Sequence, residues 1–355
     1  MTIFDTTPPA VEAAAPLGHS EADVAGATAP TKKGKRGRIV ALLLILIVIF
    51  AALFGWYLLN RKPLSELPGL SVTKLPQYQF SIYGATKPLG VAVSASGDRI
   101  YVTESDGERV VRIFDRAGKP TGTIKPPPST GTSHLPMYVA INPTTQDVYV
   151  SDRFTASVYI YDAKGTYLRT FAPKGDLGGK WAPLGLAFGR DGSLYATDIR
   201  GLTPKTHRVQ VFGPDGTLLR SMGAPGQLNF PNGIVVDAQG NVQVTDSNNG
   251  RVVIFGQYGK VLATISSGIG EGDLGLPRGA AIDDAGRLFV ADTADHMVRV
   301  YKIDSSKATP TYIGSFGGEG QLDGTFEYPN GVATDKRAHI YITDRENSRV
   351  QVWGY

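Results

Sequence analysis

One tripeptide, Pro-x-Gly, recurs at nearly constant intervals through most of the sequence. Successive copies lie 46 to 52 residues apart, and one copy has Tyr in place of Gly. The six copies begin at Pro88, Pro136, Pro183, Pro231, Pro277 and Pro329. Repetition with a period of this size is typical of architectures in which each unit buries its core only by packing on neighbouring units. No other feature of the sequence constrains the fold as tightly.

Each copy has the pattern of four short strands. In the copy that starts at Pro231, apolar runs alternate with turns at residues 237–240 and 257–259, and the second run ends on Asp246. Four antiparallel strands in about 35 residues cannot bury both faces of their sheet without a neighbour. Six such units predict an all-β fold, a six-bladed β-propeller.

The two ends of the repeat region complement each other. The sixth copy stops at Tyr355, directly after its third strand, residues 350–353. The segment Tyr78 to Tyr83 resembles the fourth strands of the other copies. We therefore expect this N-terminal strand to complete the last blade, because ring closure removes exposed sheet edges.

The last copy carries the most regular motif. Asn330 and Gly331 follow its proline, and its second strand ends on Asp344. A corner with Asn347 and Arg349 then leads into the third strand. Across residues 77–355 the repeats resemble the NHL-repeat family, which implies a six-bladed propeller and leaves function open, because propellers host many activities.

The first three copies depart from this pattern. Glu104 replaces the aspartate that ends the second strand, and Tyr138 replaces the glycine of the tripeptide. The third corner is lengthened at residues 201–206.

The N-terminal part forms a separate region. Residues 1–38 predict a disordered tail ending in a basic flank, and residues 39–59 are 21 residues without a charge, enough to span a bilayer. Five basic residues precede this span and two follow it, which predicts a cytoplasmic tail and a propeller outside. Residues 60–76 form a tether. We expect an uncleaved signal anchor in the cell membrane, with cleavage after the span as the alternative.

Charge and cysteine content exclude several functions. The whole chain has a net charge of +4, of which residues 1–62 contribute +3 through seven basic and four acidic groups. The propeller is nearly neutral, which argues against nucleic-acid binding. The sequence has no cysteine, so disulfides, thiol catalysis and Cys-based zinc modules, including the RING and B-box of some NHL proteins, are excluded.

Function should concentrate on one rim of the ring. The loops that lead into the first strands and the corners between second and third strands share this rim, which we call the loop rim; such loops on a rigid scaffold carry most binding residues. The candidate ligand- or partner-binding residues are Trp181, Phe230, Arg278, Tyr328, Arg153 and Arg345. The aromatic side chains suit either a binding pocket or packing between blades.

Metal binding is the main alternative. His134, His207 and His296 all fall on the loop rim, in loop positions that do not correspond, and three converging histidines could hold a divalent metal such as Zn²⁺. Some NHL-type lyases use a three-histidine zinc site. The six acids that end the second strands are better explained as acceptors of backbone N–H groups in their corners.

Asn232 and Asn330 stand where gluconolactonase-like propellers place metal ligands. That family also needs a glutamate early in the ring, and Leu89 and Met137 occupy the matching positions. Asparagine before glycine is more simply a turn residue.

The sequence favours a membrane-anchored, extracytoplasmic binding, scaffold or sensor module for a protein, peptide or glycan, with no cofactor. A metal-dependent lyase or lactonase at the channel mouth is the alternative, and a purely structural envelope protein is a third hypothesis.

Overall fold

A computed structural model describes residues 34–60, 75–128, 133–201, 203–266, 268, 270–304 and 309–355. The chain divides into two compact units, Met1–Val72 and Thr73–Tyr355. Most of the tail expected at residues 1–38 and of the tether expected at 60–76 lies outside the described residues, so both stay predictions.

The first unit contains one described helix, α1 (Gly34–Asn60). Its segment Gly37–Trp56, 20 residues long, is apolar and long enough to cross a membrane, a property that it shares with signal sequences. The helix begins five residues before the span expected at 39–59, because the basic flank continues the same helix.

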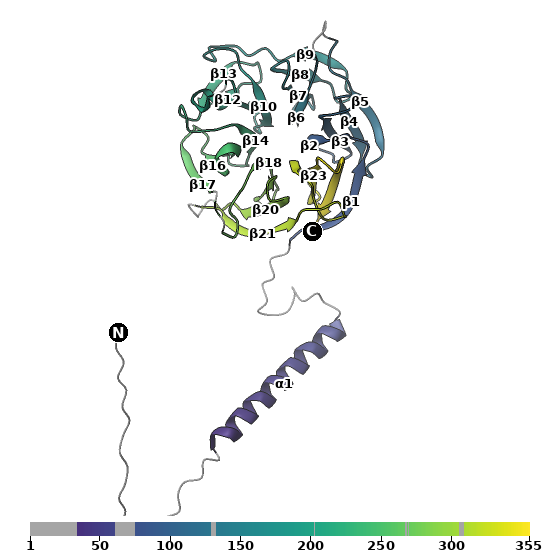
Figure 1. Cartoon of the computed structure of the whole chain (residues 1–355), viewed down its shortest axis with the longest axis vertical. Coiled ribbons are helices and arrows are strands. Elements are labelled where there is room, and N and C mark those ends of the chain that lie inside the picture. The colour runs from purple at the N-terminus through teal and green to yellow at the C-terminus, as the bar shows by residue number, and fades with distance from the viewer. Residues whose placement is uncertain are drawn as a thin grey trace, which may run out of the picture. The chain divides into compact units, whose positions relative to one another are not determined.

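The second unit is a six-bladed β-propeller (Figure 1). In the described residues, every blade is a four-stranded antiparallel sheet whose strands follow one another from the centre outward, except in the last blade. Blade 1 consists of β2 (Pro88–Val93), β3 (Arg99–Glu104), β4 (Val111–Asp115) and β5 (Pro120–Ile124). Blade 2 consists of β6 (Pro136–Ile141), β7 (Val148–Asp152), β8 (Ser157–Tyr161) and β9 (Tyr167–Thr170). Blade 3 consists of β10 (Pro183–Phe188), β11 (Leu194–Asp198), β12 (Arg208–Phe212) and β13 (Leu218–Met222).

Blades 4 to 6 follow the same plan, and every first strand starts at a proline of the repeated tripeptide. Short 3-10 helices, residues 204–206 and 247–249, occupy the corners of blades 3 and 4. Blade 4 consists of β14 (Pro231–Val236), β15 (Val242–Asp246), β16 (Arg251–Phe255) and β17 (Val261–Ile265). Blade 5 consists of β18 (Pro277–Ile282), β19 (Arg287–Asp292), β20 (Met297–Lys302) and β21 (Thr311–Gly317). Blade 6 consists of β22 (Pro329–Thr334), β23 (His339–Asp344) and β24 (Arg349–Gly354), with β1 (Gln77–Tyr83).

The ring closes as the sequence predicts. Strand β1 pairs antiparallel with β24, with Gln77 opposite Gly354 and Tyr83 opposite Arg349. The N-terminal strand is therefore the outer strand of the last blade. The sixfold repeat and the closing strand are both confirmed.

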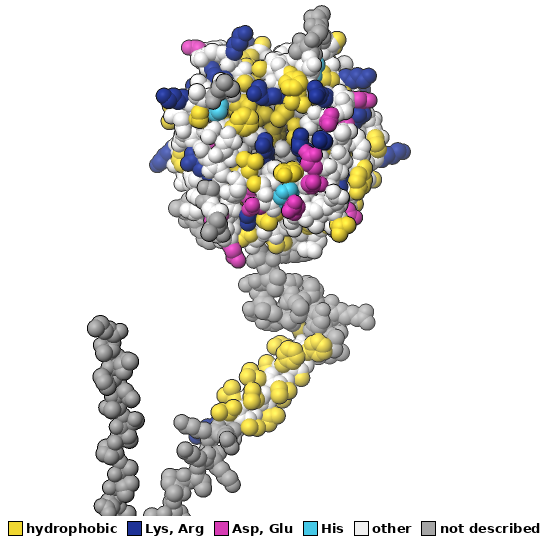
Figure 2. All heavy atoms as spheres, viewed as in Figure 1, with side chains coloured by type: hydrophobic (Ala, Val, Ile, Leu, Met, Phe, Trp, Pro, Cys, Tyr) yellow, Lys and Arg dark blue, Asp and Glu magenta, His cyan; other side chains and the backbone are white. Residues whose placement is uncertain are grey.

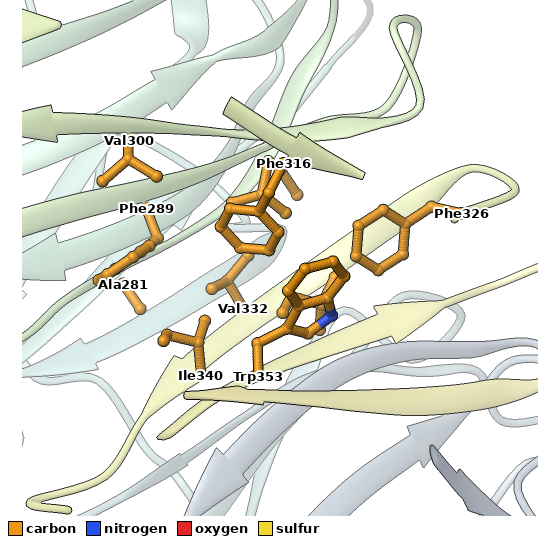
Figure 3. Close-up of a cluster of buried hydrophobic side chains, with 11 residues drawn as sticks. Ala281, Phe289, Val300, Phe316, Phe326, Val332, Ile340 and Trp353 are labelled. Carbon is orange, nitrogen blue, oxygen red and sulfur yellow. The ribbon is translucent and has the colours of Figure 1, made fainter. Parts of the chain in front are cut away.

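The core lies between the blades. Between blades 5 and 6, the Trp353 ring packs 4.4 Å from the Phe316 ring and 5.8 Å from the Phe326 ring, measured between centroids (Figure 3). Burying an apolar side chain of this kind fully contributes about 1.5–3 kcal/mol. The second and third strands are buried at almost every position, whereas outer strands such as β9 are exposed. This explains why the inner strands are continuous apolar runs in the sequence.

A ring of hydroxyl groups links each blade to the next. In blade 1, Thr103 Oγ1 accepts the Gly90 N–H at 2.7 Å and donates to the Met137 carbonyl of blade 2 at 2.7 Å. In four other blades the hydroxyl group at the same strand position also donates to a backbone carbonyl of the next blade. These residues are Ser151, Thr197, Thr245 and Thr343. Blade 5 has Ala291 there, and Thr293 donates to the Pro329 carbonyl instead. Each bond crosses from one blade to its neighbour, so together they fix the spacing of the inner strands.

The six acids at the ends of the second strands act as structural acceptors, as expected. Each is at most 1% exposed and accepts an N–H from the segment leading into its own blade, at 2.6 to 3.1 Å. In five blades an arginine pairs with this acid, namely Arg112, Arg200, Arg251, Arg299 and Arg349. In blade 2, His134 takes the arginine's place, with Nδ1 at 2.9 Å from Asp152 Oδ2.

Candidate functional site

The side chain of Tyr138 reaches into the central channel. Its hydroxyl lies 3.3 Å from Oδ1 of Asn232 in blade 4 and 3.3 Å from Oδ1 of Asn330 in blade 6. Tyr138 belongs to blade 2, so its ring reaches from one side of the channel to the other. The other five blades have glycine at this position. The single Tyr-for-Gly exchange therefore places a plug in the ring.

The plug closes the channel on the side of the loop rim. Tyr138 also lines a cavity of about 50 Å³ between the inner strands, together with residues such as Val91, Ile234 and Val332. Burial raises the pKa of Tyr138 to about 12, and the positive charge of Arg278 opposes this rise. The phenol therefore stays protonated and can donate a hydrogen bond throughout the physiological pH range.

The side chains around Tyr138 form what we call the channel mouth. Leu184 is fully buried against Tyr138, and Phe230 and Met137 are partly buried in the same cluster. Arg278 joins the group from blade 5, at the position in its first strand that Asn232 and Asn330 occupy in theirs. The face of the ring drawn in Figure 2 shows hydrophobic side chains gathered over its centre with Lys and Arg side chains among them. The channel mouth comprises Met137, Tyr138, Leu184, Phe230, Asn232, Arg278 and Asn330.

The structure separates the candidate binding residues into two groups. Phe230 and Arg278 belong to the channel mouth. Trp181 instead packs between the Phe171 and Phe212 rings, with centroids 5.8 and 5.5 Å away, so it serves the contact between blades 2 and 3. Tyr328 is 46% exposed and available to a partner.

The two remaining arginine candidates differ in their partners. Arg345 pairs with Glu346, whose carboxylate also lies 3.2 Å from Lys87 Nζ. Arg153 is exposed, and its guanidinium has no ion pair within the described residues. A free surface cation of this kind is suited to steering an acidic partner.

The three histidines occupy separate places. His207 Nδ1 accepts the Phe230 N–H at 3.0 Å, and His296 Nδ1 accepts the Tyr328 N–H at 3.3 Å. Both stand directly before a third strand, so these two positions do correspond; the lengthened corner of blade 3 obscured this in the sequence. Ser348 does the same with the Lys87 N–H. His207 and His296 thus link one blade to the loop that enters the next.

The described residues offer no ligand set for a shared metal. Among them, no group of three or more His, Cys, Asp or Glu side chains is placed to hold a metal ion. Nδ1 of each histidine already contacts a different neighbour, and His134 serves as the partner of Asp152. The metal hypothesis gains no support from this arrangement.

Acidification should weaken the link made by His207. This side chain is 5% exposed, and burial lowers its pKa below the ordinary value of 6.5. As pH falls through 6.5, this histidine binds a proton in the unfolded chain but not in the folded ring. The free energy of unfolding therefore decreases. A His207→Asn variant keeps an acceptor and should lose less stability between pH of about 7.5 and about 5 than the native chain does. Denaturant titrations at both pH values measure this difference; equal losses would contradict it.

Sequence reasoning missed the two features that shape the site. Tyr138 was noted only as a departure from the repeat, although replacing an inner glycine by a bulky residue is the signal for a side chain in the channel. The hydroxyl ring also has a signal, because Thr or Ser precedes the acid in five of the six copies.

Comparison with known proteins identifies the repeats. The NHL repeat model matches residues 228–255 and 326–353. Human NHL-repeat-containing protein 4 is 32% identical over 116 residues, covering 32% of this chain and 85% of that protein. The chain belongs to the NHL-repeat family. The two matched segments include the fourth and sixth prolines of the repeated tripeptide and the acids Asp246 and Asp344.

Other relatives of this NHL-repeat protein match over shorter shares of their length. Mouse NHL repeat-containing protein 3 is 25% identical over 197 residues, 51% of this chain and 56% of that protein. Protein brain tumor of Drosophila melanogaster is 30% identical over 129 residues, 36% of this chain and 12% of that protein. The chain therefore spans about half of the mouse protein and a small part of the Drosophila protein.

Solved structures share the fold of the NHL-repeat ring. A streptogramin B lyase matches with a TM-score of 0.56 and 12% identity, over 78% of this chain and 96% of that chain. A catalytically inactive virginiamycin B lyase from Staphylococcus aureus with quinupristin matches with a TM-score of 0.56 and 15% identity, over 79% of this chain and all of that one. At these identities the likeness shows the propeller fold alone.

Proposed function

We propose that this protein is a membrane-anchored binding module whose propeller lies outside the cytoplasm and captures a peptide segment of a partner protein at the channel mouth. NHL-repeat propellers are a protein-interaction scaffold type. The observation that carries the proposal is the closed channel. Because the Tyr138 side chain crosses it, the channel ends at this side chain, which forms the bottom of the site. Half-buried apolar and aromatic side chains beside a few polar groups are what binding sites typically present.

Two features support the choice of face. Phe230 and Tyr328 both have left-handed backbone conformations, with φ of 55° and 57°, directly before an inner strand. Backbone strain of this kind persists where the surrounding structure imposes it, and it is enriched at functional sites. The hydrogen bonds from His207 and His296 hold these two residues in place.

The membrane placement rests on the N-terminal sequence. Helix α1 contains a 20-residue segment that can cross a bilayer, and the excess of basic residues before it predicts a cytoplasmic tail. In this arrangement the propeller presents its loop rim to partners outside the cell. A nearly neutral propeller suits a partner recognised by shape and a few polar contacts.

Removing rim aromatics should abolish peptide capture. The test measures binding of a fluorescent random heptapeptide library to the full chain in detergent solution. We expect Phe230→Ala and Tyr328→Ala each to weaken retention of the selected peptides at least tenfold, because aromatic anchors dominate interface energies by roughly 2 kcal/mol or more each.

A matched control comes from the opposite rim. Tyr258 is 84% exposed in the turn between β16 and β17, so Tyr258→Ala removes a comparable aromatic from the other side of the ring. Its retention of the same peptides should equal that of the native chain. A library from which the native chain selects nothing, or a loss confined to Tyr258→Ala, would refute the proposal.

A further inference from the structure

Arg278 differs from the other arginines near the inner strands. In five blades an arginine pairs with the ring acid, as Arg349 does with Asp344. The guanidinium of Arg278 has no hydrogen bond or ion pair within the described residues, and its Nε is buried without a partner. Arg278 is half-buried, and burying its Nε–H donor without an acceptor is costly. A binding site for an anion explains why the chain keeps this group there.

The position of Arg278 places the charge at the floor of the site. It follows the proline of its blade, the position that Asn232 and Asn330 occupy in blades 4 and 6, and both asparagines reach the Tyr138 hydroxyl. The charge of Arg278 acts on the same phenol. Arg278 therefore belongs to the innermost strand of its blade, at the level of the plug, rather than to the outside of the ring.

From this geometry we infer that the channel mouth binds the C-terminal carboxylate of a peptide, held by the guanidinium of Arg278. This inference rests on the proposed function and names the group that is recognised. A guanidinium presents a planar pair of donors that fits a carboxylate in a bidentate manner.

Two observations select a chain end. Tyr138 closes the channel, so a peptide that enters along the axis must terminate there and cannot run through. The neighbouring Phe230 and Met137, which are half-buried, provide an apolar surface for the last side chain of such a peptide. Recognition of chain ends by fixed donors is an established mode of peptide binding.

The charge of the site fits a single negative group. Among the residues of the channel mouth Arg278 is the one cation; Arg345 is paired with Glu346, and Arg153 is exposed on the rim. A phosphate group carries up to two charges at neutral pH and would call for further cations. A carboxylate is matched by one guanidinium.

The test compares peptides that differ only at their last group. Heptapeptides selected on the full chain are resynthesised with a free C-terminal carboxylate and with a C-terminal amide. We expect the acid form to bind the native chain at least tenfold more tightly than the amide. Arg278→Gln should abolish this difference, and Arg190→Gln, an exposed arginine on the opposite rim, should preserve it.

The outcomes separate this inference from the proposed function. Equal binding of acid and amide to the native chain, together with a loss in Phe230→Ala, overturns the carboxylate assignment and leaves the binding module in place. Tight binding of an amidated peptide through an internal Asp or Glu overturns the chain-end assignment. If glucuronate releases the bound peptide at a lower concentration than acetate does, the site binds an acidic glycan instead of a peptide end. Failure of every peptide to bind the native chain overturns both.

Discussion

Replacing Asp344 with alanine is expected to lower the free energy of unfolding by about 3–5 kcal/mol, the range for removing one partner of a buried ion pair. The Asp344 carboxylate is 0% exposed and accepts the Glu327 N–H at 2.7 Å and Arg349 Nε at 2.7 Å. Alanine would leave the charged Arg349 side chain, which is 3% exposed, without the Asp344 carboxylate that it pairs with. Denaturant unfolding of the full chain in detergent solution, followed by tryptophan fluorescence, measures the change.

A surface acid provides the control for this variant. Glu108 pairs with Arg112 at 3.2 Å, but its side chain is 64% exposed. Exposed pairs contribute little, so Glu108→Ala should unfold at nearly the native denaturant concentration. Asp344→Asn keeps the size of the side chain and should fall between the two. Equal unfolding midpoints for Asp344→Ala and Glu108→Ala would show that the ring acids do not hold the blades.

A single methyl group at Gly90 should destabilise the ring by about 1–3 kcal/mol, the usual cost of overpacking. A Cβ on Gly90 would lie 2.7 Å from the Met137 carbonyl oxygen and 2.8 Å from the Tyr138 Cα. Both atoms are backbone of the next blade, so relief requires movement of an inner strand and of the plug that it carries. The same unfolding assay applied to Gly90→Ala tests this expectation.

Gly256→Ala is the matched control, because both glycines have ordinary backbone angles. A Cβ on Gly256 would meet only the Leu262 side chain, at 3.4 Å and beyond, and this side chain can move aside. We expect a change of less than about 1 kcal/mol there. A Gly90→Ala variant as stable as Gly256→Ala would contradict the close approach of the inner strands.

The repeat pattern was sufficient to predict the ring, its closing strand and the role of the acids. These features are local and recur once per blade, so one well-preserved copy defines the others. Strand β1 could be predicted because β24 would otherwise be an unpaired edge. The apolar helix that is long enough to cross a membrane could be predicted from length and composition alone.

The candidate site could be predicted only in part, because its residues meet through the symmetry of the ring. Tyr138 and Asn330 are 192 positions apart and touch only when the blades close. Trp181 and Phe230 look alike in the sequence, one residue apart in their distance from the next proline, yet one packs between blades and the other reaches the channel mouth. Such choices depend on side-chain direction, which spacing does not encode.

The orientation of the propeller and the identity of its binding face can be tested together, because the chain has no cysteine. Tyr328→Cys marks the loop rim and Tyr258→Cys marks the opposite rim, while Thr31→Cys marks the tail. A membrane-impermeant maleimide added to intact cells should label the two propeller positions and spare the tail. Addition of a selected peptide should then protect Cys at position 328 and leave position 258 unchanged. Labelling of the tail alone, or protection at position 258 instead, would contradict the account.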